Sequence, residues 1–145
     1  NNAASSSSKS QSKENASEAD TNSEAITVER DGTYDSKDEV ALYIHTYGEL
    51  PSNYITKKEA RSLGWEGGSV EEYAEGKCIG GDYFGNYEGI LPDEDGIRYT
   101  ECDINTRSKG SRGGERIIFD NQGNIYYTDD HYRSFTKLYD KDGKL

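Results

Sequence analysis

The sheet of this protein is predicted by residues 115–128, which read Glu115-Arg-Ile-Ile-Phe-Asp-Asn-Gln-Gly-Asn-Ile-Tyr-Tyr-Thr128. β-Branched and aromatic residues fill both ends of this stretch, as is typical of short strands. Between them, Asp120-Asn-Gln-Gly-Asn124 is a compact hairpin connection, because Gly123 or an Asn can adopt a positive φ at little cost. The stretch therefore predicts two neighbouring antiparallel strands, Glu115–Phe119 and Ile125–Thr128.

The same pattern extends to both sides of this hairpin. From Gly76 to the C-terminus, short β-branched and aromatic runs alternate with turn residues. These runs predict three further strands, at Lys77–Phe84, Ile97–Ile104 and Ser134–Tyr139. Only 31% of the residues are hydrophobic, so twelve tyrosines and one tryptophan must supply much of the core volume.

Upstream of Gly76 the pattern is helical. Capping boxes, in which Ser or Thr is followed three residues later by Glu, occur at Ser36–Glu39, Thr56–Glu59 and Ser69–Glu72. Apolar residues at helical spacing follow the first box, and Gly48 can end that helix. The second predicted helix ends at Gly64 and the third near Gly76. Helices followed by strands predict an α+β fold, with three N-terminal helices packed on one face of a five-stranded antiparallel sheet.

One folded domain and one tail are the predicted organisation, since the length suits a single core. Residues 1–35 are rich in Ser, Asn, Lys and Glu and contain almost no large apolar side chains. Ordering them would cost more entropy than burial could return. We expect a disordered Ser-rich linker over 1–35 and a folded domain over 36–145. No apolar run reaches the roughly 20 residues that a membrane-spanning helix needs.

The two cysteines, Cys78 and Cys102, fall in the first two predicted strands. Their spacing matches neither a zinc ribbon nor a CxxC redox site. If the two strands are antiparallel neighbours, the thiols could face one another and form a disulfide in an exported chain. In a reducing cytosol they would remain two half-buried thiols.

The net charge of −11 is unfavourable for binding a polyanion. Residues 1–38 contain four Lys or Arg and eight Asp or Glu, and the rest of the chain is also acidic. A phosphate ligand would therefore need a local basic cluster. Residues 107–116 contain four basic residues and three glycines. This loop could surround a phosphate with guanidinium groups and backbone N–H donors, or it is simply a solvated surface loop.

The sequence contains two histidines, and they differ in context. His45 falls in the middle of a predicted helix, where a structural role is expected. His131 follows a strand, where a loop can present its imidazole to solvent. A carboxylate, an imidazole and paired arginines on one sheet face would suit phosphodiester chemistry without a metal. The candidates from the residues alone are Glu101, Asp103, Asp129, Asp130, His131, Arg112, Arg116 and Lys57. No metal-ligand cluster is seen, and no cofactor is expected.

Four segments, in one order along the chain, carry a more specific signal. They are Tyr47-Gly-Glu-Leu-Pro-Ser-Asn-Tyr-Ile-Thr-Lys-Lys-Glu-Ala-Arg-Ser-Leu-Gly-Trp65, Gly76-Lys-Cys-Ile-Gly-Gly-Asp-Tyr-Phe-Gly-Asn-Tyr-Glu-Gly89, Glu101-Cys-Asp-Ile-Asn105 and Thr128-Asp-Asp-His-Tyr-Arg-Ser-Phe-Thr-Lys137. From about Val40 to Leu138 the chain resembles the barnase/binase family of secreted bacterial ribonucleases, which prefer guanine. The fold of that family, helices followed by a five-stranded antiparallel sheet, agrees with the pattern described above.

The resemblance implies cleavage of single-stranded RNA on the 3′ side of guanine, through a 2′,3′-cyclic phosphate and without a metal. Glu101 resembles the general base of the family, and His131 resembles its general acid. The residues that would stabilise the reacting phosphate are Arg112, Arg116 and Lys57. The residues that would bind guanine are Gly85, Asn86, Tyr87 and Glu88, and Tyr132 matches the tyrosine beside the catalytic histidine.

Two positions depart from the family. Gly85 replaces the usual serine. Tyr87 stands where arginine is common, and the loss of that cation should weaken contacts with RNA and with any barstar-like inhibitor. Neither cysteine matches a family cysteine, so the disulfide rests on strand geometry. We expect a monomer that is secreted, or held at the cell surface through its tail. The alternatives are the nuclease domain of an interbacterial toxin and an inactive RNA- or protein-binding module on the same scaffold.

Overall fold

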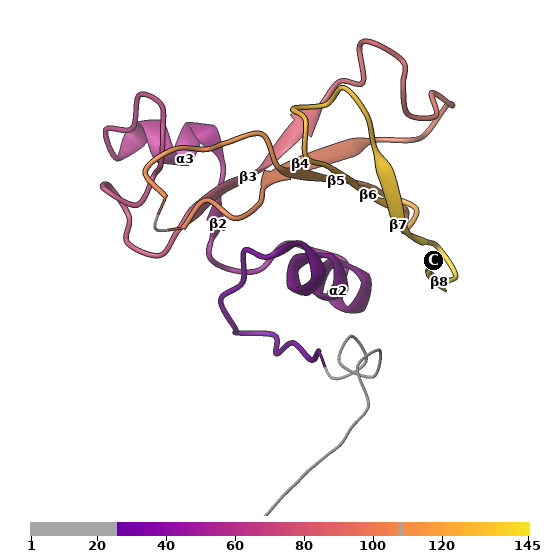
Figure 1. Ribbon diagram of the computed structural model, residues 1–145, viewed down its shortest axis with the longest axis horizontal. Coiled ribbons are helices and arrows are strands. Elements are labelled where there is room, and N and C mark those ends of the chain that lie inside the picture. The colour runs from indigo at the N-terminus through magenta and orange to yellow at the C-terminus, as the bar shows by residue number, and fades with distance from the viewer. Residues whose placement is uncertain (1–25, 108) are drawn as a thin grey trace, which may run out of the picture.

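The computed structural model describes residues 26–107 and 109–145, which form helices followed by a sheet (Figure 1). Within these residues, helix α2 spans Lys37–Tyr47 and helix α3 spans Lys57–Ser62. The strands are β2 (Tyr54–Ile55), β3 (Cys78–Phe84), β4 (Tyr99–Asp103), β5 (Arg116–Asp120), β6 (Ile125–Thr128), β7 (Thr136–Asp140) and β8 (Gly143–Lys144). The predicted α+β class is confirmed.

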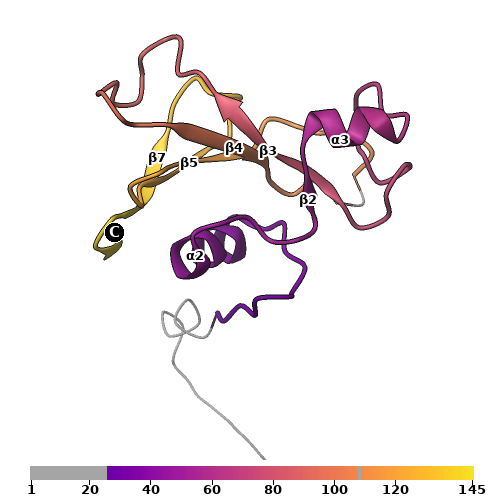
Figure 2. The same ribbon diagram turned by 180° about the vertical axis from the view of Figure 1, so that it is seen from behind.

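The strands of the described residues form one seven-stranded sheet in the order β2-β3-β4-β5-β6-β7-β8 (Figures 1 and 2). Neighbours are antiparallel except β2 and β3, which run parallel. The five strands predicted from the sequence correspond to β3–β7. The predicted number was wrong because β2 and β8 are two residues long, which is too short to show alternation.

Both of the first two predicted helices form with the predicted caps. The Ser36 hydroxyl accepts a hydrogen bond from the Glu39 N–H at 3.4 Å, and α2 ends at Gly48, whose φ is 76°. Thr56 and Glu59 form a complete capping box at the start of α3. These ends are set by local side-chain-to-backbone bonds, which is why the sequence predicts them.

The predicted third helix was wrong, because residues 69–76 form turns. The Ser69 hydroxyl accepts from the Glu71 N–H at 3.3 Å, two residues along the chain, and so closes a turn there. One helical bond follows, from the Ala74 N–H to the Val70 carbonyl at 3.0 Å. Val70 itself is buried against Trp65 in a small separate cluster. A short turn is therefore enough to place the Val70 side chain in this cluster.

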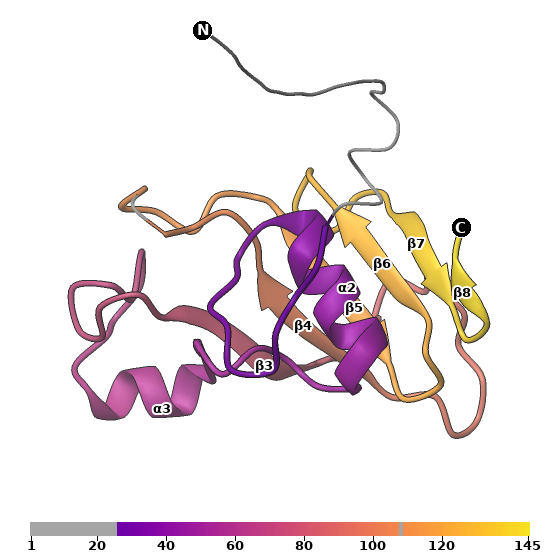
Figure 3. The same ribbon diagram turned by 90° about the horizontal axis from the view of Figure 1, so that it is seen from below.

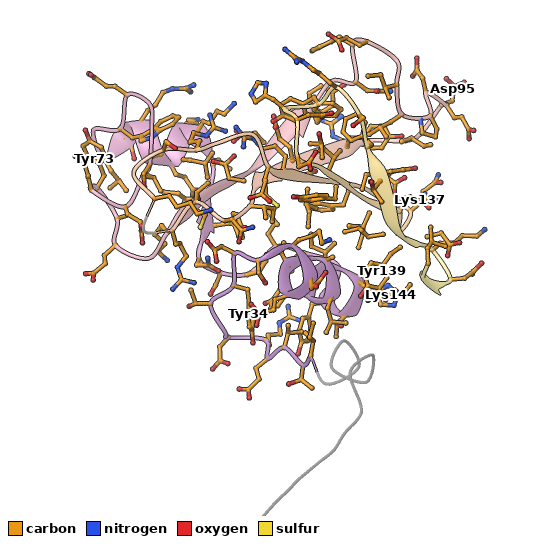
Figure 4. The ribbon with its side chains drawn as sticks, in the orientation of Figure 1. Tyr34, Tyr73, Asp95, Lys137, Tyr139 and Lys144 are labelled. Atoms are coloured by element: carbon orange, nitrogen blue, oxygen red, sulfur yellow. The ribbon has the colours of Figure 1, made fainter. Side chains whose placement is uncertain are left out.

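The two helices do not share a face of the sheet, which differs from the predicted packing. Helix α2 lies across one face and contacts β6 and β7, whereas α3 lies beyond the β3 side of the sheet (Figure 3). Tyr139 of β7 lies beside α2, where its ring stacks on that of His45 at 4.6 Å (Figure 4).

Two apolar clusters lie on opposite faces of the sheet. The cluster beneath α2 includes Cys102 and Ile117, which are paired across β4 and β5. Side chains alternate along a strand, so the neighbouring pair, Glu101 and Ile118, points to the other face. Ile118 packs there with Leu91, Tyr99 and Tyr126. The face that α2 leaves open therefore carries Glu101.

Residues 26–35, which the sequence prediction assigns to the tail, are coil and turn that contact the domain. The Asn105 N–H donates to the Asp35 carbonyl at 2.8 Å, and the Asn53 side chain donates to the Tyr34 carbonyl at 2.9 Å. Residues 1–25 lie outside the described residues, and the linker stays a prediction there. No helix of the described residues has the length and apolar character to cross a membrane.

The predicted disulfide was wrong, since Cys78 and Cys102 are both free thiols. Strands β3 and β4 are antiparallel neighbours, as expected, but their register pairs Cys102 with Gly80. A Cβ atom on Gly80 would fall 2.6 Å from the Cys102 Cβ and 2.5 Å from the Tyr54 ring. Cys102 and Tyr54 therefore pack over the Gly80 backbone, and both thiols lie in the core beneath α2.

We expect both thiols to react with Ellman's reagent only after unfolding. Burial raises the pKa of Cys78 to about 11 and that of Cys102 well above its usual value, so neither is a thiolate near neutral pH. Thiol titration under non-reducing conditions should find two thiols per chain in guanidinium chloride and very slow reaction in the native protein. The absence of thiols after unfolding would show that a disulfide is present.

Candidate active site

A pocket of about 470 Å³ opens on the sheet face opposite α2. Its walls come from the end of β3, the loop after it, the middle of β4 and the loop after β6. The residues predicted from the sequence that line it are Glu101, His131, Tyr132, Gly85, Asn86, Tyr87 and Glu88. The fold thus brings together the predicted base, the predicted acid and the predicted guanine loop.

Glu101 lies in the middle of the sheet, between Asp82 of β3 and Ile118 of β5. The hydroxyl of Tyr132 donates a hydrogen bond to Glu101 Oε1. Burial and, second, this bond raise the pKa of Tyr132 above its usual value. Tyr132 is therefore a neutral donor, which orients the carboxylate toward the pocket.

His131 is exposed in the turn that follows β6. Its φ is 59°, and its ring meets the edge of the Tyr132 ring at 4.8 Å. The backbone N–H of His131 donates to the Gly114 carbonyl at 3.0 Å. A Cβ on Gly114 would lie 3.5 Å from the His131 backbone nitrogen, an ordinary van der Waals contact, so the approach does not require a glycine there. The hydrogen bond ties the histidine loop to the loop that leads into β5.

Asp103 holds the two predicted arginines in place. It accepts from Arg112 Nε at 2.7 Å and Nη2 at 2.9 Å, in a bidentate pair, and Arg116 Nε lies 3.1 Å from its Oδ1. The hydrogen bonds to Asp103 raise the pKa of Arg112. The side chains of Asp103 and Arg116 are 2% and 3% exposed, so this charge cluster is buried.

Neither Arg112 nor Arg116 lines the pocket. Arg116 reaches the pocket through the Tyr132 hydroxyl, to which its Nε donates at 3.1 Å. That hydroxyl also binds Glu101, so a chain of contacts joins Arg116 to the carboxylate. The Arg112 carbonyl accepts from Arg116 Nη1 at 3.1 Å, and the Arg112 guanidinium lies 5.9 Å from the centre of the Trp65 ring.

Lys57 also lies outside the pocket lining. As the first residue of α3, it donates its backbone N–H to Asp82 Oδ2 at 3.0 Å. Asp82 is the cross-strand partner of Glu101, so α3 begins one strand away from that carboxylate.

The two departures from the family, Gly85 and Tyr87, are coupled in the structure. Tyr87 is 90% exposed, and its ring lies over the backbone of Gly85. A Cβ on Gly85 would fall 2.2 Å from that ring, so a serine there would displace it. Asn86, between them, has a φ of 54°, and its side chain bonds to both the N–H and the carbonyl of Leu91.

Sequence reasoning missed several residues of the pocket, namely Tyr83, Phe84, Ile90, Arg133 and Phe135. The ring of Phe84 stacks on that of Tyr132 at 5.3 Å. Alternation could have found Phe84, which lies two residues from Asp82 on the face of Glu101. Arg133 and Phe135 belong to an irregular loop, where no periodicity reveals direction.

The fold and the pocket define an α+β domain with a carboxylate and an imidazole at one site and two arginines behind it. Within residues 26–107 and 109–145, no group of three or more His, Cys, Asp or Glu could hold a metal ion. A model of the ribonuclease family matches residues 37–139. The chain belongs to the ribonuclease family.

Individual relatives agree with this assignment. The chain is 47% identical over 103 residues to a ribonuclease of Bacillus intermedius, an alignment that covers 70% of this chain and 63% of that protein. It is 46% identical over 103 residues to a ribonuclease of Heyndrickxia coagulans, covering 70% and 94%. A guanyl-specific ribonuclease St of Saccharopolyspora erythraea is 44% identical over 55 residues, covering 38% and 54%. The chain thus matches less than two thirds of the length of the Bacillus intermedius protein.

Replacement of Asp103 by Ala should destabilise the fold strongly, because it leaves buried Arg116 and half-buried Arg112 without their carboxylate. Removing one partner of a buried ion pair costs about 3–5 kcal/mol. Urea unfolding measures this loss. Asp129→Ala, at an exposed position, is the control and should cost less than about 0.5 kcal/mol. Equal effects of the two substitutions would show that the Asp103 cluster does not stabilise the fold.

Proposed function

We propose that this chain is an endoribonuclease that cleaves single-stranded RNA on the 3′ side of guanine, without a metal. The observation that carries the proposal is the shared pocket of Glu101, His131 and the 85–88 loop. A general acid, a general base and a loop that recognises guanine then act on one nucleotide. Membership of the ribonuclease family and the similarity to a guanyl-specific relative support the same activity.

In the proposed reaction, Glu101 removes the proton of the ribose 2′-OH. The 2′ oxygen attacks the adjacent phosphorus, and the bond from phosphorus to the 5′ oxygen breaks. His131, in its imidazolium form, protonates that leaving oxygen, and a 2′,3′-cyclic phosphate forms. Water then opens the ring with the two roles reversed. A substrate without the 2′-OH, such as DNA, cannot enter this sequence.

Charge on the phosphoryl oxygens is stabilised in this proposal by Arg116, Arg112 and Lys57. Arg116 is buried and held in place, and it acts close to Glu101 through the shared Tyr132 hydroxyl. None of the three basic residues lines the pocket, so their direct contact with phosphate requires side-chain movement.

Guanine is read by the loop at residues 85–88. Backbone N–H groups bind the O6 atom of the base, and the Glu88 carboxylate accepts from its N1–H and amino group. The Asn86 side chain closes this loop onto Leu91 at 2.9 and 3.1 Å, which fixes the backbone donors before RNA arrives.

His131→Ala and Glu101→Ala should each reduce kcat for GpA cleavage by roughly 10² to 10⁴, the range for loss of one general acid or base. His45→Ala is the matched control, since His45 is exposed on α2 and lies on the far face. EDTA should leave the wild-type rate unchanged. A Mg²⁺ requirement, or normal rates in either site variant, would contradict the mechanism.

Tyr87→Arg should lower KM and steepen its salt dependence, because a phosphate-directed cation adds counterion release without reading bases. Glu88→Gln should instead reduce the preference for guanine over adenine by about 1–3 kcal/mol, as a charged hydrogen-bond partner is lost. Cleavage of GpA and ApA at two salt concentrations distinguishes the two effects. A larger change of base preference in Tyr87→Arg would show that this division of the loop is mistaken.

A further inference from the structure

The loop that presents His131 has an unusual backbone. His131 and Tyr132 have φ values of 59° and 77°, so two consecutive non-glycine residues are left-handed. Side chains disfavour this region, and a loop of this kind persists only where its surroundings hold it. The bond from the His131 N–H to Gly114 fixes one atom of the loop but not the turn itself.

One carboxylate, that of Asp130, closes the turn. Its Oδ1 accepts from the Arg133 N–H and the Ser134 N–H, both at 3.0 Å. Its Oδ2 accepts from the Ser134 hydroxyl at 2.6 Å. The Asp130 carboxylate therefore accepts three hydrogen bonds from the residues that follow His131, although Asp130 does not line the pocket itself.

The same carboxylate is anchored to the sheet. The Thr128 hydroxyl, at the buried end of β6, donates to Asp130 Oδ1 at 2.7 Å. That hydroxyl also accepts from the N–H groups of Asp130 at 3.3 Å and Tyr132 at 3.1 Å. The turn is thus closed from both sides of His131 onto a rigid strand.

We propose that Asp130 is a positioning residue, which holds the His131 loop in the left-handed conformation that places the imidazole at the pocket. The proposal rests on the proposed role of His131 as the acid. The hydrogen bonds from Ser134 and Thr128 keep the pKa of Asp130 below its usual range, so it remains an acceptor. Asp129, one residue earlier, is exposed, and its carboxylate accepts no hydrogen bond from the described residues.

The test compares Asp130→Ala, Asp130→Asn and Asp129→Ala with the wild-type protein. Asp130→Ala should lower kcat for GpA on the order of 10- to 100-fold, because a small misplacement of a reacting group has that effect. The change in KM should be smaller than the change in kcat, since the guanine loop belongs to another segment, although Arg133 and Phe135 of the closed loop also line the pocket. Asp130→Asn should retain most of kcat, because its amide oxygen can accept the bonds of Oδ1 and its amide group can donate to the Ser134 hydroxyl. Asp129→Ala removes the same charge and should leave kcat unchanged.

A second measurement is independent of catalysis. In ¹⁵N relaxation experiments, the amides of His131 and Tyr132 should become mobile in Asp130→Ala and stay ordered in Asp130→Asn and Asp129→Ala. If Asp130→Ala does not fold, Ser134→Ala removes a single bond of the set and should show a smaller change in the same two measurements.

Two results would overturn the positioning role. One is normal kcat and ordered loop amides in Asp130→Ala while His131→Ala is inactive. The other is equal impairment of Asp130→Asn and Asp130→Ala, which would assign the effect to charge. A wild-type protein that does not cleave GpA would contradict the proposed function instead, and the relaxation experiment would still decide the positioning role.

Discussion

Alternation along β4 places Cys102 in the core beneath α2 and turns Glu101 and Asp103 to the opposite face. The site depends on this constraint, because β4 lies between β3 and β5 and cannot slip without exposing its buried residues. Glu101 is thereby held in the lining of the pocket. Asp103, two residues further along the strand, binds Arg112 and Arg116. One strand supplies both the carboxylate that lines the pocket and the carboxylate that binds the two arginines.

The positive charge near the pocket is local and largely paired with a carboxylate. The chain carries a net charge of −11, and Arg112 and Arg116 are both bound to Asp103, whereas Arg133 lines the pocket. Under the proposed function, long-range attraction of RNA would therefore be weak, and binding would depend on contacts inside the pocket. Tyr87 fits this picture, because the exposed ring on the Gly85 backbone presents an uncharged surface at the pocket.

The two proposed proton-transfer groups are held by different means. Glu101 has the rigidity of a central strand, while His131 lies on a loop that would be free without its hydrogen bonds. Tyr132 connects the two, since it follows His131 in the loop and binds Glu101 through its hydroxyl. The spacing of base and acid across a phosphate therefore depends on both the sheet and the loop.

The features that could be predicted from the sequence are those that local chemistry controls. The caps at Ser36 and Thr56 and the hairpin at residues 120–124 all formed as predicted, because each involves neighbouring residues. The family resemblance also singled out Glu101, His131 and residues 85–88, which line one pocket in the structure.

Tertiary structure decided the rest, where distant residues compete or cooperate. The box at Ser69 formed a turn in which Val70 packs against Trp65, and Cys102 pairs with Gly80 while both cysteines remain free thiols. The strand register and the binding of two arginines by Asp103 depend on residues far apart in sequence. The position of the Tyr87 ring over the Gly85 backbone depends on exact packing distances. Local patterns contain no information on such distances, so only the folded chain could determine them.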